Sequence, residues 1–185
     1  MKYITTILMF CMFSAISNAQ YVSNLKIHYE GNFTTQDGKD YDVAVFEGKD
    51  ATELFEMVKK HVALIFNSPK DVESNVDDKV ISIFGYASNV VSFTYGYRFY
   101  ISFHYSLKFQ FKDGKIRIEV PVLTKMEGYF LPTLNDMFKN AHVFNKHGVL
   151  SDKPKKRKIA TDIEDYYNDL INRIINGNSK AKDDW

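Results

Sequence analysis

A long run of alternating side chains, from Val91 to Val122, constrains the fold of this chain more than any other feature. From Val91 to Phe111 every second residue is apolar or aromatic, which is the period of a β-strand. The Asp113-Gly114 pair favours a tight hairpin, because a type I′ turn requires positive φ at its central positions. The alternation resumes from Ile116 to Val122, so the sequence predicts an antiparallel hairpin.

The turn also fixes the register of this hairpin. With Asp113 and Gly114 in the turn, the predicted apolar pairs are Phe111–Ile116, Phe109–Ile118, Leu107–Val120 and Tyr105–Val122, and the polar pairs on the opposite face are Lys108–Glu119 and Gln110–Arg117. A strand from Val91 to Phe111 would be far longer than usual, so we expect the run to bend or turn near Gly96.

Shorter strands are predicted before the hairpin. Two are expected between Tyr21 and Phe46, separated by a turn at Gln36–Lys39. Another strand is predicted at Lys79–Tyr86. Both of its alternating sets contain apolar residues, so we expect both faces of this strand to be buried. The strand should end at Ala87-Ser88-Asn89. Pro121 suits an edge or a strand end, because proline cannot donate to a ladder, and a loop should start at Met126-Glu127-Gly128.

Two amphipathic helices are predicted, each with a start signal. Asp50 followed by Glu53 forms a capping box ahead of an apolar stripe that runs from Leu54 to Phe66 and ends before Pro69. Thr161 with Glu164 forms a second box, and the following stripe stops at Gly177. The basic run Lys153–Lys158 is interpreted as a solvated linker before this helix, with contact to an acidic surface as the alternative. One or two helical turns are expected within Leu131–Phe138.

The first 19 residues have the pattern of a secretion signal, with Lys2 at the start, an apolar stretch and small residues before a cleavage site after Ala19. We therefore expect a leader at 1–19, one domain at 20–177, a flexible tail at 178–185, and a secreted or periplasmic location. No later stretch approaches the length of a transmembrane helix. The sole cysteine, Cys11, lies in the leader, so the mature chain would have no disulfide or thiol nucleophile.

Charge argues against a polyanionic partner. Without Lys2 the chain keeps 23 basic and 23 acidic residues, so it carries no net charge. Nothing in this balance attracts nucleic acid.

Three stretches of the sequence together match a known family. They are Glu53-Leu54-Phe55, Ile65-Phe66-Asn67-Ser68 with the strand up to Gly85, and the run Tyr105-Ser106-Leu107-Lys108-Phe109 into Lys112-Asp113-Gly114-Lys115-Ile116-Arg117. With these stretches the chain resembles the secreted Bacteroidetes proteins grouped as domain of unknown function 4468 (DUF4468), a family described as having a fold like the TATA-binding protein (TBP-like). The family commonly has a tryptophan near the end of the first helix, where this chain has His61 or a neighbour.

The resemblance implies a fold and a location outside the cytoplasm. It implies no activity that could be assigned to particular residues. It implies an α+β fold with a curved antiparallel sheet of about 4–6 strands, an N-terminal crossover helix and a C-terminal helix on one face. Only one copy of the pattern is present, so the two-repeat saddle that binds DNA is not expected.

Motifs of catalysis and metal binding are absent from the sequence. There is no Gly-x-Ser-x-Gly, no His-Glu-x-x-His and no phosphate-binding glycine loop, so we predict a protein without catalytic residues, cofactor or metal. His142 and His147 supply only two ligands at an unusual spacing, and His61 suits a packing role beside the first apolar stripe. The calcium-like pieces Asp37-Gly38-Asp40 and Asp77-Asp78 are interpreted as turns.

A binding surface is the remaining functional prediction. Tyr95, Tyr97 and Tyr100 lie near the expected bend, and His104 and Arg117 fall on the polar face of the hairpin, whereas Phe103, Phe109 and Phe111 suit the core. We predict a module that binds an unknown protein or surface component. The alternative is a carrier of an apolar small molecule between the sheet and the C-terminal helix. The sequence does not indicate an oligomeric state.

Overall fold

The structure is a computed structural model that describes residues 20–66, 73–76, 79–95, 97–128 and 133–177. For 73–76, Phe93, Tyr95 and Tyr97 it describes the backbone alone. The predicted leader at 1–19, the tail at 178–185, and the Asp77-Asp78 and Pro69 positions lie outside the described residues.

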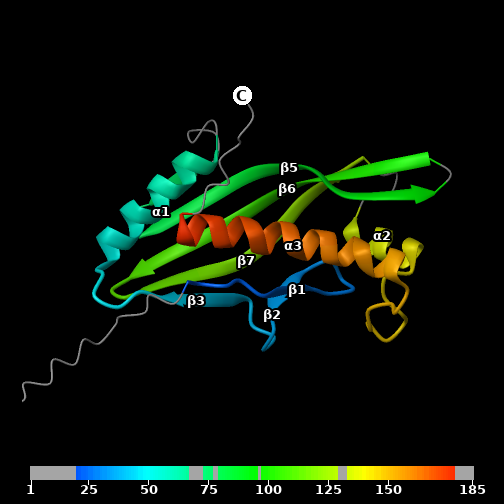
Figure 1. The fold of residues 1–185 in the computed structure, drawn as a ribbon, viewed down its shortest axis with the longest axis horizontal. Coiled ribbons are helices and arrows are strands. Elements are labelled where there is room, and N and C mark those ends of the chain that lie inside the picture. Colours follow the sequence, from blue (N-terminus) through cyan, green and yellow to red (C-terminus); the bar gives the residue numbers. More distant parts are fainter. Residues whose placement is uncertain (1–19, 67–72, 77–78, 96, 129–132, 178–185) are drawn as a thin grey trace, which may run out of the picture.

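The main element is a five-stranded antiparallel sheet with the strand order β3-β7-β6-β5-β4 (Figure 1). Its strands are β3 (Tyr41–Val45), β4 (Glu73–Val76), β5 (Val80–Tyr95), β6 (Tyr97–Lys112) and β7 (Lys115–Glu127). A second sheet pairs β1 (Leu25–Ile27) with β2 (Phe33–Thr35). Sequence analysis predicted strands around β1 and β3 and missed β2 between them.

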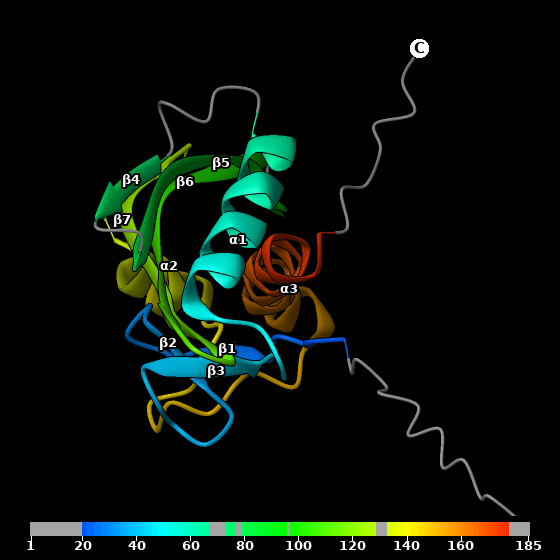
Figure 2. The same ribbon diagram turned by 90° about the vertical axis from the view of Figure 1, so that its left-hand side faces the viewer.

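Three helices complete the fold: α1 (Ala51–Ile65), α2 (Leu134–Ala141) and α3 (Pro154–Asn176). The main sheet curves around α1 and α3, which both lie on its concave side (Figure 2). The predicted α+β architecture, a curved antiparallel sheet with an N-terminal and a C-terminal helix on one face, is confirmed.

The predicted hairpin register holds next to the turn and fails further along. Phe109 pairs with Ile118 and both are at most 2% exposed, as predicted. Beyond Glu119 the register shifts, because Val120 and Pro121 together oppose Leu107 in a β-bulge. The predicted pairs Leu107–Val120 and Tyr105–Val122 are therefore wrong.

Proline explains where this shift occurs. Pro121 has no N–H for the ladder, and bulges are among the few places where a strand accepts it. Val122 consequently pairs with Ser106 and is 56% exposed. The pairing of β3 with β7 ends at Glu119, two residues before Pro121. At Pro121, therefore, β7 no longer has β3 beside it. β7 continues to Glu127, and the loop predicted from Met126 begins later.

The predicted turn near Gly96 is confirmed, because Tyr95 pairs with Tyr97 across it. The predicted break at Ala87-Ser88-Asn89 is wrong, since β5 continues through it with an irregularity between Ala87 and Val91. Asn89 adopts a left-handed conformation (φ 53°), which asparagine tolerates better than most residues. The chain therefore bulges at this point without leaving the sheet.

The start of α1 follows the sequence prediction. Asp50 Oδ1 accepts from the Glu53 N–H at 2.8 Å, and Glu53 Oε2 accepts from the Asp50 N–H at 3.0 Å. Both halves of the predicted capping box are thus present. His61 also has its predicted packing role: Nδ1 lies 2.8 Å from Ile174 O, a carbonyl to which the ring can only donate.

The start of α3 differs from the prediction. The helix begins at Pro154, so the basic run predicted as a linker forms its first turns. Proline is favoured at the first helical position, where its missing N–H costs nothing. Thr161 is inside the helix, where its hydroxyl donates to Arg157 O at 3.2 Å, and it caps nothing. Gly177 ends the helix in a left-handed conformation (φ 73°), as predicted.

The core lies between the concave face of the sheet and the two long helices. Phe103, Phe109 and Phe111 belong to it, as predicted. Tyr167 of α3 is fully buried, and its ring makes edge contacts with Phe33 at 5.4 Å and Tyr105 at 5.3 Å. Aromatic packing of this kind holds α3 against both sheets.

Candidate functional site

The convex side of the main sheet carries large apolar side chains in solvent. Phe84 on β5 and Val122 on β7 both pair with Ser106, so the three form one row across the sheet. Phe84 is 59% exposed and Val122 is 56% exposed. In the next row Tyr86, which is 52% exposed, pairs with His104. We call Phe84, Tyr86, His104 and Val122 the outer patch.

Sequence analysis missed the apolar part of the outer patch. It interpreted the two apolar sets of Lys79–Tyr86 as a strand covered on both faces, and this is wrong for Phe84 and Tyr86, which are exposed. Ile81 and Ile83, which belong to the other alternating set of this strand, are buried on the concave side. The alternating pattern does place Phe84 and Tyr86 on one face of the strand. It does not tell whether a second layer of the protein covers that face or whether the face is exposed to solvent.

His104 joins the patch to a charged group. Its ring lies 4.9 Å from the ring of Tyr86, and Nε2 is 3.1 Å from Glu127 Oε1. Lys125 Nζ donates to the same oxygen at 2.6 Å. The bonds from Lys125 and then His104 hold the pKa of the Glu127 carboxyl below its usual range, because both stabilise its charged form.

The other predicted site residues are dispersed. Arg117 lies in a different cross-strand row, opposite Gln110, and its guanidinium stacks 4.0 Å above the Tyr41 ring. The structure therefore does not bring Arg117 together with His104. Tyr100 is 46% exposed, and on β6 it is on the same side as His104. The side chains of Tyr95 and Tyr97 lie outside those described.

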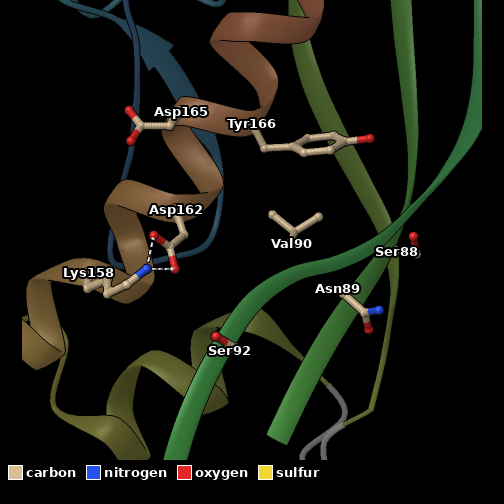
Figure 3. Close-up of a pocket in the computed structure, with 8 residues that line it drawn as sticks. All are labelled: Ser88, Asn89, Val90, Ser92, Lys158, Asp162, Asp165 and Tyr166. Carbon is tan, nitrogen blue, oxygen red and sulfur yellow. Dashed lines mark hydrogen bonds and ion pairs between the residues drawn. The ribbon is translucent and has the colours of Figure 1, made fainter. Parts of the chain in front are cut away.

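A pocket that the sequence did not predict lies where β5 bulges beside α3 (Figure 3). Its volume is about 370 Å³. The residues lining it are Ser88, Asn89, Val90 and Ser92 of β5 and Lys158, Asp162, Asp165 and Tyr166 of α3. Lys158 Nζ donates to Asp162 Oδ2 at 2.6 Å, and burial raises the pKa of the Tyr166 hydroxyl.

Two further observations concern metals and membranes. Among the residues with described positions, no three His, Cys, Asp or Glu side chains gather into a group that could hold a metal ion. His142 and His147 both lie in the segment after α2, with His142 as its C-cap. No helix in the described ranges combines the length and apolar character needed to span a bilayer.

Comparison with known proteins gives likeness of structure only. No family model matches the sequence, and no curated protein matches it. A solved DUF4468 family protein from Bacteroides ovatus superposes with a TM-score of 0.51 and 13% identity, over 77% of this chain and 87% of that one. This chain shares its fold. The resemblance to DUF4468 predicted from the sequence is confirmed at that level.

A second solved structure is described as a TBP-like protein from Parabacteroides distasonis. It gives a TM-score of 0.46 at 16% identity, over 74% of this chain and 91% of that one.

Proposed function

We propose that this chain is a secreted, non-enzymatic domain that binds a protein partner through the outer patch. The observation that carries the proposal is the exposure of Phe84, Tyr86 and Val122 in two neighbouring rows of the convex face, where the three residues are 59%, 52% and 56% exposed. Apolar groups gathered in this way on a soluble domain mark interaction surfaces, because burying them against a partner removes them from water.

The charges around the patch favour a protein as the partner. Lys108 pairs with Glu119 at 3.1 Å and Lys125 with Glu127 at 2.6 Å, so both signs border the apolar centre. A rim of mixed charge around an apolar centre is typical of protein interfaces, whereas a polyanion requires a basic surface.

The alternative of an apolar carrier receives less support from the packing. A carrier would need an apolar cavity of about 300 Å³ or more between the sheet and α3. The pocket of about 370 Å³ between β5 and α3 is lined mostly by polar and charged side chains. In the core between the sheet and α3, Tyr167 makes ring contacts with Phe33, Tyr105 and Tyr166. Native mass spectrometry of the exported protein separates the two functions, since a carrier would retain a small molecule.

Secretion of a single domain spanning 20–177 is part of the proposal. It is supported by the leader pattern of the first 19 residues. Amino-terminal sequencing of protein from the medium or periplasm should give Gln20 as the first residue. An intact Met1 in the exported fraction would contradict it.

The partner can be sought by photo-crosslinking in cells that export the protein. A benzophenone amino acid at position 84 should give one discrete adduct, because Phe84 is the most exposed side chain of the outer patch. Adding Val122→Asp should abolish that adduct, since it places an unpaired charge in the outer patch.

Leu64 provides the matched control. It is 60% exposed, like Phe84, but lies on α1, away from the patch. The same probe at position 64 should not give the adduct. Identical adducts from both positions, or an adduct insensitive to Val122→Asp, would rule out the outer patch as the interface.

A further inference from the structure

A second surface, separate from the outer patch, begins at the free edge of β5. In the described residues β4 pairs with β5 only from Val80 to Ile83, so from Phe84 onward one edge of β5 has no strand beside it. Such an edge presents N–H and C=O groups that are complementary to the backbone of another strand.

The bulge opens this edge beside α3. Ser88, Asn89 and Val90 together oppose the single residue Ser102, and the Asn89 N–H donates to Ser102 Oγ at 3.0 Å. This bond fixes the bulge from the β6 side. The side chains of Ser88 and Asn89 form no hydrogen bond within the described part of the chain, so their polar groups remain available to a ligand.

α3 forms the opposite wall because α1 does not extend this far. α1 meets the other end of α3, where His61 binds Ile174 O and its ring lies against Gly177. The preceding part of α3, from Lys158 to Tyr166, faces the pocket of about 370 Å³. In Figure 3 the Tyr166 ring reaches from α3 towards β5, and Val90 lies between the two walls.

The charge of the pocket favours an uncharged occupant. Lys158 and Asp162 neutralise each other one turn apart on the helix. Asp165 also lines the pocket, but in Figure 3 its carboxylate points away from β5 and Val90. The other groups on the two walls are hydroxyls and an amide, from Ser88, Asn89, Ser92 and Tyr166, and these suit the N–H and C=O groups of a peptide backbone.

We propose that the groove between β5 and α3 binds an extended, uncharged peptide segment of a partner protein, which pairs with the free edge of β5. The segment would add a strand next to β5 and place alternate side chains against Val90 and Tyr166. This site uses none of the outer patch residues, so it stands apart from the proposed function above.

The test is an NMR titration of the full exported chain with a blocked hexapeptide of alternating threonine and valine. Saturable amide shifts are expected at 88–92 and 158–166, with a dissociation constant of about 1 mM or below. The same peptide methylated on alternate backbone nitrogens should give no saturable shifts, because it cannot form a ladder. Equal binding of both peptides, or shifts confined to Phe84 and Tyr86, would overturn the proposal.

Ser92→Trp tests the location with little risk to the core, since Ser92 is exposed and lines the groove. It should abolish peptide binding, and Thr124→Trp, at an exposed position on β7, should leave it unchanged. Unchanged binding by Ser92→Trp would place the peptide elsewhere. A dimer that forms through the β5 edge and is broken by Ser92→Trp would assign the groove to a second copy and refute a peptide partner.

Discussion

Asn168 of α3 binds the backbone of Leu25 twice: its Oδ1 accepts from the Leu25 N–H at 2.8 Å and its Nδ2 donates to the Leu25 carbonyl at 3.1 Å. Asn176 binds Tyr21 in the same way, at 3.1 and 2.8 Å. A side-chain amide here does what a neighbouring strand would do for Leu25.

Two other α3 residues complete the series, which we call the α3 ladder. Asn172 Oδ1 accepts from the Ser23 N–H at 2.6 Å, and Glu164 Oε1 accepts from the Ile27 N–H at 3.0 Å. Ladder residues are four apart on the helix, a rise of about 6 Å, and their partners are two apart on an extended chain, about 6.6 Å. The two spacings nearly match, so one helix face can pair with a whole strand edge.

Replacing Asn168 with leucine should lower the free energy of unfolding by about 2–3 kcal/mol, because the Leu25 N–H and C=O would lose their partners. Leu25 is 1% exposed, so water cannot substitute. Urea denaturation followed by circular dichroism measures the change. Asn24→Ala, an exposed site beside Leu25, should stay within about 0.5 kcal/mol; equal losses in the two variants would contradict a role for the ladder.

The α3 ladder shows why some of the fold could not be predicted from the sequence. The hairpin and α1 follow from periodicity and caps within a few residues, such as Asp113-Gly114 and the Asp50–Glu53 box. The bonds from Asn176 to Tyr21 join residues 155 positions apart, and each asparagine alone is also typical of a surface helix position. Glu164 shows the same limit: it matched a capping box, yet it binds Ile27.

The candidate site depends on relationships of the same non-local kind. The alternation around Phe84 and Tyr86 predicts which residues share a face, but the exposure of that face depends on α1 and α3 both lying on the other side. The pocket depends on the bulge at Asn89, where sequence analysis expected a break. His104 was predicted as a site residue because strand period alone placed it on the polar face.

Two capping signals in the sequence should differ in their energetic importance. Asp50→Ala should cost about 1 kcal/mol of stability, because the Glu53 N–H loses its acceptor. Thr161→Ala should change stability by less than about 0.5 kcal/mol, or raise it, because Thr161 lies inside α3, where alanine is the better helix former. Thermal unfolding of both variants checks this. A loss of about 1 kcal/mol at Thr161 would favour a helix that starts there.

The turn before β3 should hold an unusually acidic carboxyl. Bonds from Lys39 and Thr35 lower the pKa of Asp37 to about 2, from an ordinary value of 3.8. Because the folded-state pKa is depressed, the stabilisation is complete above about pH 4 and is lost as the pH falls towards 2. A carboxyl-detected NMR titration should show this midpoint, and Lys39→Ala should raise it, whereas Lys112→Ala should not. A midpoint near 3.8 in the unmodified chain would contradict the ion pair.

Gly85 should not tolerate even a methyl group, because a Cβ at this position would lie 2.4 Å from both Cζ and the hydroxyl oxygen of Tyr105. Tyr105 pairs with Gly85 across the strands and is 2% exposed, so its ring cannot move aside into solvent. Gly85→Ala should therefore lower the free energy of unfolding by about 2–3 kcal/mol through overpacking.

A double variant tests this cause. Tyr105→Leu should itself destabilise by about 2 kcal/mol through lost packing, but it removes the clash. The double variant should then be more stable than the sum of the two losses predicts, by about 1 kcal/mol or more, in a urea denaturation cycle. Strict additivity would mean that Tyr105 does not limit the space at Gly85.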